Sequence, residues 1–305
     1  MNMIRPALAF LFLLTGIATT VAQNNILVFQ SDFGLRDGAV SAMKGVAMSV
    51  SDDLEIFDVT HEITAYNIEE AAYRLKQVAA YWPKGTVFVS IIDPGVGSQR
   101  KSIVLKTKSG HYFVSPDNGT LTLIADALGI EAVRIIDETK NRLKGSEGSY
   151  TFHGRDVYAY TGARLAAGVI KFEGVGPLLS DPMVRLPIIL PVVSGNEIKG
   201  MIPVLDVQYG NVWTNIDAES LKKIGVATGD MLEVKISFDN ETKFEGKVLF
   251  ANTFADVKEG EVLGYLNSLM NFSLAINMGN FASTHAIASG ERWTITVRKI
   301  SGQHR

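Results

Sequence analysis

The chain has 305 residues, 47% of them hydrophobic and 20% charged, which is enough for a full core and predicts two domains. The absence of cysteine excludes thiol catalysis and cysteine-ligated zinc. The formal net charge of −3, with no block of basic residues, argues against nucleic acid as a partner.

Residues 1–22 have the layout of a secretory signal peptide. Arg5 is the only charged residue among them, an apolar run covers residues 7–14, and small residues at 20–22 predict cleavage before Gln23. The run is shorter than the ~18 apolar residues of a membrane span, which favours removal over an uncleaved anchor. We therefore expect an exported protein, periplasmic or secreted, that has no membrane contact once the signal is cleaved.

The first half of the mature chain alternates between strand-like and helix-like segments. Strands are predicted for its β-branched and aromatic runs, at residues 26–29, 54–57 and 86–90. Helices are predicted where apolar residues recur at helical spacing, at residues 40–50 and 68–82. Asn67 is expected to cap the second helix, with Glu70 three places on. This order predicts an α/β fold with a mainly parallel sheet and helices on its faces.

A hairpin, a further strand and further helices complete the first predicted domain, residues 23–190. They are expected at residues 102–107 and 112–115, at 132–136, and from about 121 and about 156. Beyond a proline-flanked run at 187–191, short strand-like runs alternate with Gly, Asn and Asp turns. This pattern predicts a smaller C-terminal domain, residues 191–305, that is an antiparallel β-barrel or a sandwich.

Three predicted strands end in polar residues at one edge of the sheet: Asp32, Thr60 with His61, and Asp93. Ligands bind at this edge in open α/β sheets, so we expect a binding crevice there. The sequence has neither a GxGxxG fingerprint nor a GxxxxGK[ST] phosphate loop. A crevice lined by carboxylates suits ribose hydroxyls, ammonium groups or a cationic substrate.

Asp93, Arg100 and His153 form a candidate acid–base cluster. Asp93 leaves its strand into an Asp-Pro-Gly turn, Arg100 follows seven residues later, and His153 precedes a Gly-Arg-Asp segment. Catalysis is one interpretation, and the other is structural, with Asp93 capping its turn and His153 capping a helix. His61 is expected to be a hydrogen-bonding core residue. No spacing resembles a metal-ligand motif, so no metal site is predicted.

Seven short segments occur in an order that resembles one enzyme family. They are Ser-Asp-Phe-Gly (31–34), Asp-Val-Thr-His-Glu (58–62), Asp-Pro-Gly-Val-Gly (93–97), Ser-Pro-Asp-Asn-Gly (115–119), Phe-His-Gly-Arg-Asp (152–156), Tyr-Gly-Asn-Val (209–212) and Asn-Met-Gly (277–279). Together they are similar to the S-adenosylmethionine hydrolase, or hydroxide adenosyltransferase, family, which is related to bacterial fluorinases and chlorinases. The resemblance covers essentially the whole mature chain.

The resemblance implies hydrolysis of S-adenosyl-L-methionine to adenosine and L-methionine, by a water that attacks the ribose 5′ carbon. It implies a catalytic triad of Asp93, Arg100 and His153, no metal or organic cofactor, and a homotrimer whose sites lie between subunits. The implied substrate-binding residues are Asp32 for the ribose hydroxyls, Tyr66 beside the nucleoside, Asp206 and Asn211 for the ammonium group, Ser268 for the carboxylate, and Asn277 and Met278 for the adenine edge.

Two alternatives stay open, a secreted nucleoside-binding protein without turnover and an S-adenosylmethionine-dependent halogenase. The halogenases lack the aspartate and histidine that correspond to Asp93 and His153, and they carry a long insertion before the Pro-Asp-Asn-Gly turn. Only 19 residues separate Gly97 from Asp117, so the resemblance is to the water-using branch. Leu269 stands where halogenases have arginine, so recognition of the carboxylate must differ in detail.

Location is where the residues and the resemblance disagree. Family members are expected to meet S-adenosylmethionine in the cytoplasm, where it is made, whereas the signal peptide predicts export. An exported enzyme would act on scavenged substrate or on a related sulfonium nucleoside. The sequence does not specify which member of the triad accepts the proton.

Overall fold

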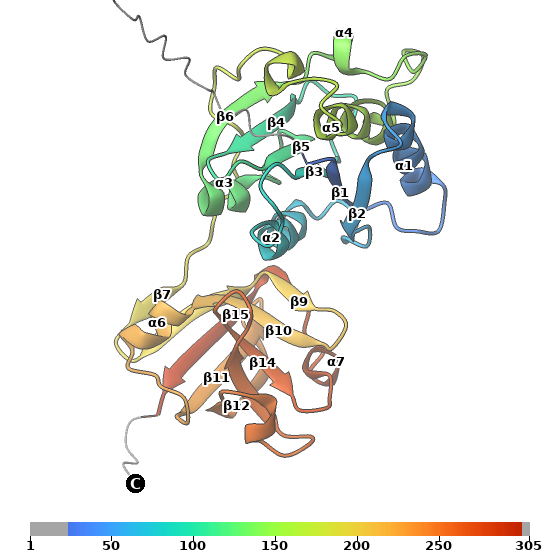
Figure 1. Cartoon of the computed structure of the whole chain (residues 1–305). Coiled ribbons are helices and arrows are strands. Elements are labelled where there is room, and N and C mark those ends of the chain that lie inside the picture. The colour runs from blue at the N-terminus through green and yellow to red at the C-terminus, as the bar shows by residue number, and fades with distance from the viewer. Residues whose placement is uncertain (1–23, 301–305) are drawn as a thin grey trace, which may run out of the picture.

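The structure, a computed structural model, describes residues 24–300, so the predicted signal peptide lies outside the described residues. Two sheets form two domains, one above the other in Figure 1, and an extended segment at residues 180–191 connects them. No helix within residues 24–300 is long and apolar enough to cross a membrane.

The first domain contains a six-stranded sheet in the order β2-β1-β3-β5-β4-β6. Its strands are β1 (Ile26–Ser31), β2 (Glu55–Thr60), β3 (Val87–Ile91), β4 (Ser102–Thr107), β5 (Tyr112–Pro116) and β6 (Ile130–Ile135). Neighbours among β2, β1, β3 and β5 are parallel, whereas β4 is antiparallel to β5 and β6. The prediction of a mainly parallel sheet and of the β4–β5 hairpin is confirmed.

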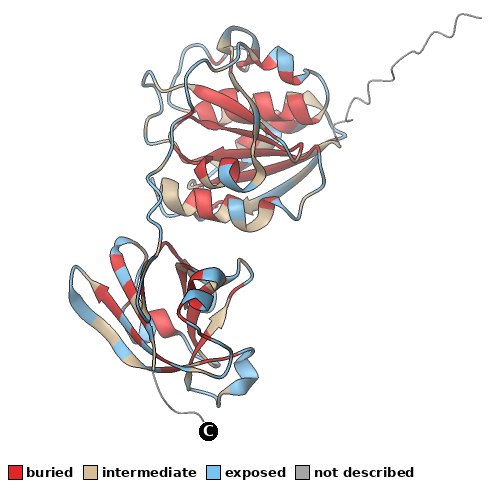
Figure 2. Ribbon diagram, turned by 90° about the vertical axis from the view of Figure 1, so that its left-hand side faces the viewer, coloured by how far each residue is buried: buried red, intermediate tan, exposed pale blue. Residues whose placement is uncertain are grey.

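Helices cover both faces of this sheet, which explains its nearly continuous apolar strands. They are α1 (Ala39–Val50), α2 (Ile68–Ala79), α3 (Thr122–Leu128), α4 (Glu138–Asn141), the π-helix η1 (Gly154–Ala159), α5 (Tyr160–Ala166) and the 3-10 helix η2 (Phe172–Val175). Leu27 and Phe29 pack with α1, η1 and α5, whereas Val28 packs with α2 and α3 on the other face. Figure 2 shows the resulting buried layer.

Helix α2 begins as predicted. The side chain of Asn67 accepts a hydrogen bond from the backbone N–H of Glu70 at 3.0 Å. The Glu70 carboxylate does not close a reciprocal box, because it accepts from the backbone N–H of Thr64 instead. The helix ends at Ala79, three residues before the predicted end at Trp82.

The second domain contains a nine-stranded sheet in the order β7-β8-β15-β11-β12-β13-β14-β10-β9. Its elements are β7 (Val192–Ser194), β8 (Glu197–Ile202), β9 (Val204–Asp206), β10 (Asn211–Asp217), α6 (Ala218–Lys223), β11 (Met231–Phe238), β12 (Glu241–Phe250), the 3-10 helix η3 (Phe254–Asp256), β13 (Val262–Leu266), β14 (Asn271–Ile276), α7 (Phe281–Thr284) and β15 (Gly290–Lys299). All its described pairs are antiparallel except β12 with β13.

The predicted closure of this second sheet into a barrel is not confirmed. No backbone pairing among residues 24–300 joins the two edge strands, β7 and β9, and each of them has only three residues. The strands nevertheless surround one apolar core, to which Ile198, Leu232 and Ile295 belong.

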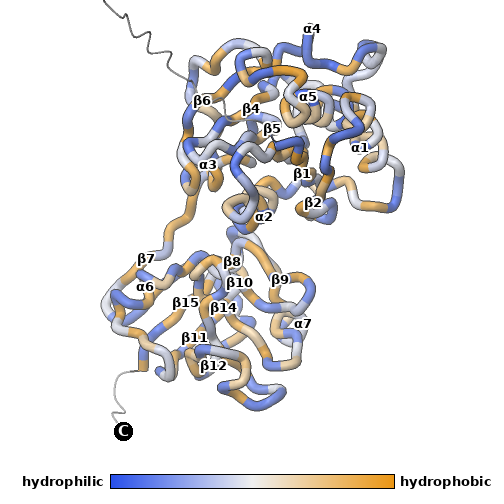
Figure 3. Tube along the Cα trace, in the orientation of Figure 1, coloured by the Kyte–Doolittle hydropathy of each residue, from blue (hydrophilic) through white to orange (hydrophobic). Residues whose placement is uncertain are grey.

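Helix α2 is the element through which the first domain contacts the second. Tyr73 packs with Val204 and Trp213, and Nη2 of Arg74 donates to the backbone oxygen of Leu205 at 2.7 Å. Figure 3 shows that the connecting segment is largely hydrophobic where it reaches the second domain. Residues 186–191 line a cavity of about 210 Å³ with Tyr73, so the connection packs against both domains.

Candidate active site

The strands β2, β1 and β3 deliver polar residues to one edge of the first sheet, as predicted. They are parallel neighbours, and their last residues lie side by side, Gln30 opposite Thr60 and Ser31 opposite Ile91. Asp32 and Asp93 follow directly after β1 and β3. The carboxylates of the candidate site therefore belong to the sheet edge that carries ligand sites in open α/β folds.

Asp93 and Arg100 form a buried ion pair at this edge. Strand β3 runs toward the edge and β4 runs back, so both ends of the loop between them stay there. Nε of Arg100 donates to Oδ1 of Asp93 at 2.7 Å, and Nη2 donates to Oδ2. The side chain of Arg100 is only 12% exposed, and that of Asp93 is only 6% exposed. Burial lowers the pKa of Arg100, but the hydrogen bond to Asp93 and the charges of neighbouring groups together outweigh burial and raise that pKa overall, so the guanidinium stays charged.

His153 lies against the same guanidinium. Its Nδ1 is 3.2 Å from Nη2 of Arg100, and because arginine can only donate, Nδ1 must accept. Burial and the nearby positive charge lower the pKa of His153, which favours the neutral ring. A neutral ring that accepts at Nδ1 carries its proton on Nε2. That Nε2 is buried and has no hydrogen-bond partner among residues 24–300, so it presents a free donor at the cluster.

Two further side chains complete the cluster, and the sequence analysis did not identify them. Nη1 of Arg100 donates to Oγ of Ser102 at 3.0 Å, and this hydroxyl donates to the hydroxyl of Tyr158 at 3.2 Å. Tyr158 in turn donates to Oδ2 of Asp93 at 3.4 Å. The sequence signal for Tyr158 is its position five residues after His153. This spacing places two side chains on one side of a π-helix, which η1 is, but not of an α-helix.

Asp32 and Tyr66 are brought together by a backbone hydrogen bond. Oδ2 of Asp32 accepts from the N–H of Tyr66 at 2.8 Å, and the Tyr66 side chain is exposed at a positive φ of 69°. His61 lies behind them as a buried core residue, as predicted. Its Nδ1 is 2.7 Å from Oγ of Ser31, and its Nε2 is 3.1 Å from Oδ1 of Asp58.

The second domain presents Asp206 and Asn211 as a pair. They face each other across the β9–β10 turn, where Nδ2 of Asn211 donates to Oδ2 of Asp206 at 3.0 Å. Gly210 makes this turn possible, because its φ is +69° and a Cβ there would lie 1.9 Å from the side chain of Asn280. The Oδ1 atom of Asp206 makes no hydrogen bond to the described residues, so one oxygen of the pair is available to a ligand.

The remaining predicted substrate contacts lie on exposed turns of the second domain. Ser268 is exposed, Met278 is exposed at a positive φ of 58°, and Nδ2 of Asn277 donates to the backbone oxygen of Val257. Leu269 packs against the apolar cluster beneath α2. Among residues 24–300, no hydrogen bond or ion pair links these turns to the Asp93 cluster within one chain.

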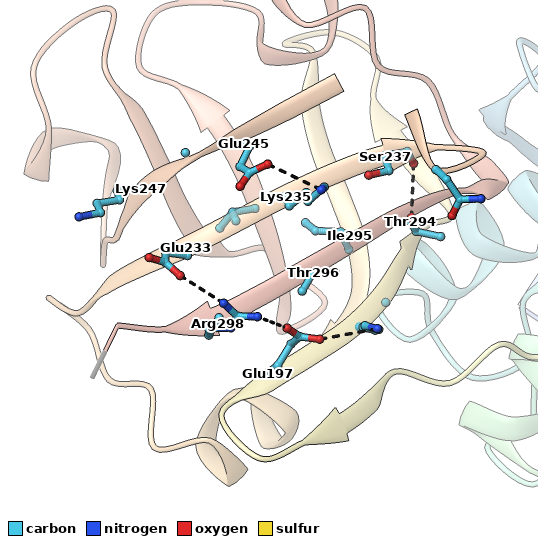
Figure 4. A pocket seen from close by; sticks show the side chains of 15 residues that line it. Glu197, Glu233, Lys235, Ser237, Glu245, Lys247, Thr294, Ile295, Thr296 and Arg298 are labelled. Carbon is cyan, nitrogen blue, oxygen red and sulfur yellow. Dashed lines mark hydrogen bonds and ion pairs between the residues drawn. The ribbon is translucent and has the colours of Figure 1, made fainter. Parts of the chain in front are cut away.

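A larger cavity than the one beside Tyr73 lies elsewhere, on the second sheet (Figure 4). It measures about 850 Å³ and is lined by residues of β8, β11, β12 and β15. Most of its charges pair with one another: Arg298 contacts Glu197 and Glu233, and Lys235 contacts Glu245. This is the pattern of a solvated sheet face rather than of a site with charges free for a ligand. Within the described part of the chain, no three His, Asp or Glu side chains are grouped to hold a metal ion.

Comparison with known proteins identifies relatives over most of the chain. Residues 27–176 match the family described as the SAM hydroxide adenosyltransferase N-terminal domain, and residues 200–294 match its C-terminal domain. An (R)-S-adenosyl-L-methionine hydrolase of Methanocaldococcus jannaschii is 37% identical over 77% of this chain and 82% of its own length. A fluorinase of an Actinoplanes species is 30% identical over 90% of this chain and 98% of its own.

A solved structure shows the same fold. The crystal structure of an uncharacterized conserved protein from Thermotoga maritima superimposes with a TM-score of 0.82 and is 33% identical in sequence. The match covers 89% of this chain and 99% of that one, so it includes both domains.

Proposed function

This chain belongs to the S-adenosylmethionine hydroxide adenosyltransferase family, and we propose that its active site is the buried Asp93–Arg100–His153 cluster. It is an S-adenosyl-L-methionine hydrolase, which converts this substrate to adenosine and L-methionine. The observation that carries the assignment of the site is the free, buried N–H of His153 beside the paired Asp93 carboxylate. We propose that this N–H binds one water, at the same edge of the sheet as Asp32.

The chemistry needs a well-placed water more than it needs an acid. Methionine leaves the sulfonium as a neutral thioether, so no group has to protonate it. The demanding step is to hold a desolvated water in line with the 5′ carbon. The water oxygen bonds to C5′, the C5′–S bond breaks, and its electron pair stays on sulfur.

We assign the proton transfer to Asp93. His153 cannot act as the base in the form described, because Arg100 occupies Nδ1 and the proton occupies Nε2. Its role is to donate to the water oxygen. Among the described residues, Oδ1 of Asp93 receives one hydrogen bond, from Nε of Arg100, and so keeps a lone pair for the proton of the water. Arg100 stabilises the charge that develops in the cluster.

The substrate contacts proposed for the family's positions fit the chemistry of the side chains. Asp32 would hold the ribose hydroxyls beside Tyr66, and the free oxygen of Asp206 would take the ammonium group with Asn211. Ser268 would contact the carboxylate, and Asn277 and Met278 the adenine edge. Because Leu269 packs under α2, we assign it no contact with the substrate.

We propose a homotrimer in which the first domain of one subunit meets the second domain of its neighbour. Large side chains are exposed at both halves of the predicted site: Tyr66 is 71% exposed, Tyr209 is 65% and Met278 is 82%. A neighbouring subunit and the substrate would cover them. Exposed apolar surface of this kind is a common mark of such contacts.

An assay of the mature protein tests the activity directly. Purified residues 23–305 are incubated with S-adenosylmethionine, and adenosine is followed by chromatography in metal-free and metal-supplemented buffer. We expect adenosine in both, because we propose that no cofactor is needed. No adenosine above a heat-killed control would refute the activity, and retained binding in calorimetry would then favour a nucleoside-binding protein. The similarity to a fluorinase makes halogenation the second candidate, which predicts 5′-halo-adenosine in high chloride.

Co-expression of two impaired variants tests the shared site. Asp93→Ala disables the first-domain half, and Asp206→Ala weakens the second-domain half. In randomly mixed trimers roughly a quarter of inter-subunit sites would combine two intact halves, so kcat/KM should recover to about that fraction of the parent value. A mixture no better than the sum of its two parents would place each site within one chain.

We further propose that the mature protein acts outside the cytoplasm, as its N-terminal sequence predicts. Cell fractionation and N-terminal sequencing test this. We expect a mature terminus at Gln23 in the exported fraction. An intact Met1 on cytoplasmic protein would overturn export and leave the catalytic proposal unaffected.

A further inference from the structure

The Asp93–Arg100 pair closes a ring of hydrogen bonds in which two routes lead from Arg100, the donor, to Asp93, the acceptor: one is direct, and the other passes through Ser102 and Tyr158. Arg100 donates to Ser102, Ser102 donates to Tyr158, Tyr158 donates to Asp93, and Asp93 accepts from Arg100. Every link joins two side chains, and the three links outside the ion pair measure 3.0 to 3.4 Å. Hydrogen bonds in such a chain polarise and strengthen one another.

The ring is sealed from water on the side of Tyr158. The Tyr158 side chain is completely buried, and Ser102 is 4% exposed. Burial strongly raises the pKa of the Tyr158 hydroxyl, so the group keeps its proton and acts as a donor. The guanidinium of Arg100 lies 5.5 Å from the centre of the Tyr158 ring, which adds a cation–π contact.

The π-helix η1 places Tyr158 and His153 on the same cluster. Residues five apart lie on one side of a helix with i→i+5 hydrogen bonds, whereas in an α-helix they would diverge by about 140°. His153 stands at the start of η1 and Tyr158 lies within it. Both reach the Asp93–Arg100 pair, one through Nδ1 and the other through its hydroxyl. The wide turn is therefore what lets one short segment contact the pair twice.

We infer that Tyr158, held by Ser102, is a positioning residue for the hydrolysis. By occupying Oδ2 of Asp93 it fixes the rotation of the carboxylate and leaves Oδ1 as the oxygen that takes the proton of the water. Arg100 donates to both carboxylate oxygens, so it does not by itself distinguish Oδ1 from Oδ2, whereas Tyr158 donates to Oδ2. The inference rests on the proposed function, and it adds a residue that touches neither water nor substrate.

Tyr158→Phe tests it, with Tyr112→Phe as the matched control. Tyr112 is a buried tyrosine of the same domain whose hydroxyl makes no hydrogen bond to the described residues. We expect kcat of Tyr158→Phe to fall about tenfold, as loss of a hydrogen bond to a charged group predicts. KM should stay within about twofold, because the lost contact acts on the reacting water rather than on binding. Tyr112→Phe should leave kcat and KM unchanged.

A double-variant cycle with Ser102→Ala tests whether the ring acts as a unit. We expect the double variant to be at most about twofold slower than the slower single variant, because both break the same ring. If the fold-losses in kcat of the two single variants multiply in the double variant, the proposal that the ring acts as a unit is refuted. A Tyr158→Phe enzyme with the parental kcat would also refute it. If Tyr158→Phe does not fold, Ser102→Ala carries the test by its kcat and KM. A parent protein that forms no adenosine would refute the proposed function itself, which is a separate result.

Discussion

The proposed catalytic cluster of the first domain and the proposed recognition turns of the second domain are built in opposite ways. Asp93, Arg100 and His153 are buried and bonded to one another through their side chains. Met278 and Ser268 are exposed on turns. The side chains of the first region are bonded to one another within a single chain, whereas those of the second region are left exposed.

The difference indicates which side chains must be ordered before the substrate binds. A cluster that moves a proton must hold its geometry before the substrate arrives, since misplacement of the reacting atoms lowers the rate steeply. The proposed recognition groups can be ordered by the substrate and, in the proposed trimer, by the neighbouring subunit. The following experiments break one region while leaving the other intact.

The largest effect is expected from the cluster. Asp93→Ala, Arg100→Ala or His153→Ala should each lower kcat by on the order of 10²–10⁴, with a smaller effect on KM, as loss of a positioned proton-transfer group does. Steady-state kinetics with melting temperatures measures this. Asp181→Ala is the control, because Asp181 forms an exposed pair with Lys101 in the same domain and should leave kcat unchanged. Folded variants with full turnover would remove the triad from the mechanism.

The recognition turns should affect binding instead. Asp206→Ala and Asn211→Ala are each expected to weaken S-adenosylmethionine binding by roughly 1.5–3 kcal/mol, through loss of charge-assisted contacts to the ammonium group. Adenosine lacks this group, so calorimetry should find that both variants bind it nearly as the parent does. Equal losses for both ligands would show that these two residues do not contact the ammonium group.

Replacing Gly210 should lower both the stability of the second domain and its binding of S-adenosylmethionine. Gly210→Ala forces a Cβ against Asn280, whereas Gly225→Ala has the same φ of +69° and meets nothing within 4 Å. Strain alone should cost Gly225→Ala about 1 kcal/mol of unfolding free energy. Gly210→Ala should cost clearly more and weaken S-adenosylmethionine binding, because the turn that pairs Asp206 with Asn211 must open. Chemical denaturation measures both, and equal costs would contradict the clash.

The smallest effect is a pH dependence of the cluster. Burial lowers the pKa of His153 below its usual 6.5, so kcat/KM should be flat near neutrality and fall only at acid pH, with a midpoint below 6.5. Protonated His153 cannot accept from Arg100. Stability follows the same sign: the contribution of neutral His153 is complete above pH 6.5 and is lost as pH falls through the lowered folded-state pKa. As a control, His285→Gln, which changes a histidine of the second domain, should leave the fall of kcat/KM at acid pH unchanged.

The sequence predicted the parts of this molecule that have local signals. The strand before Asp93 and the helix cap at Asn67 each depend on a few consecutive residues. The structure has both at the predicted positions. The parallel pairing of β12 with β13 was not predicted, because alternation identifies a strand but not its partner.

Tyr158 was missed for a related reason. The prediction of a helix from about residue 156 assumed 3.6 residues per turn, which would point Tyr158 away from His153. The segment forms a π-helix instead, beginning at Gly154. No intrinsic propensity marks such a turn, which is set by the contacts of the finished fold. Ser102 was missed because a serine at the start of a strand has no distinctive neighbours in sequence.

The spacing of the cluster along the chain also has a consequence for how the enzyme folds. Asp93 and Arg100 are seven residues apart, so their contact closes a short loop, at a small cost in entropy. His153 is 53 residues from Arg100, and Tyr158 is 65 residues from Asp93, so these contacts belong to the slow, non-local part of folding. The charged pair can therefore form while the chain is incomplete, but the reactive geometry appears only when η1 docks. We therefore expect turnover to appear only after η1 has docked.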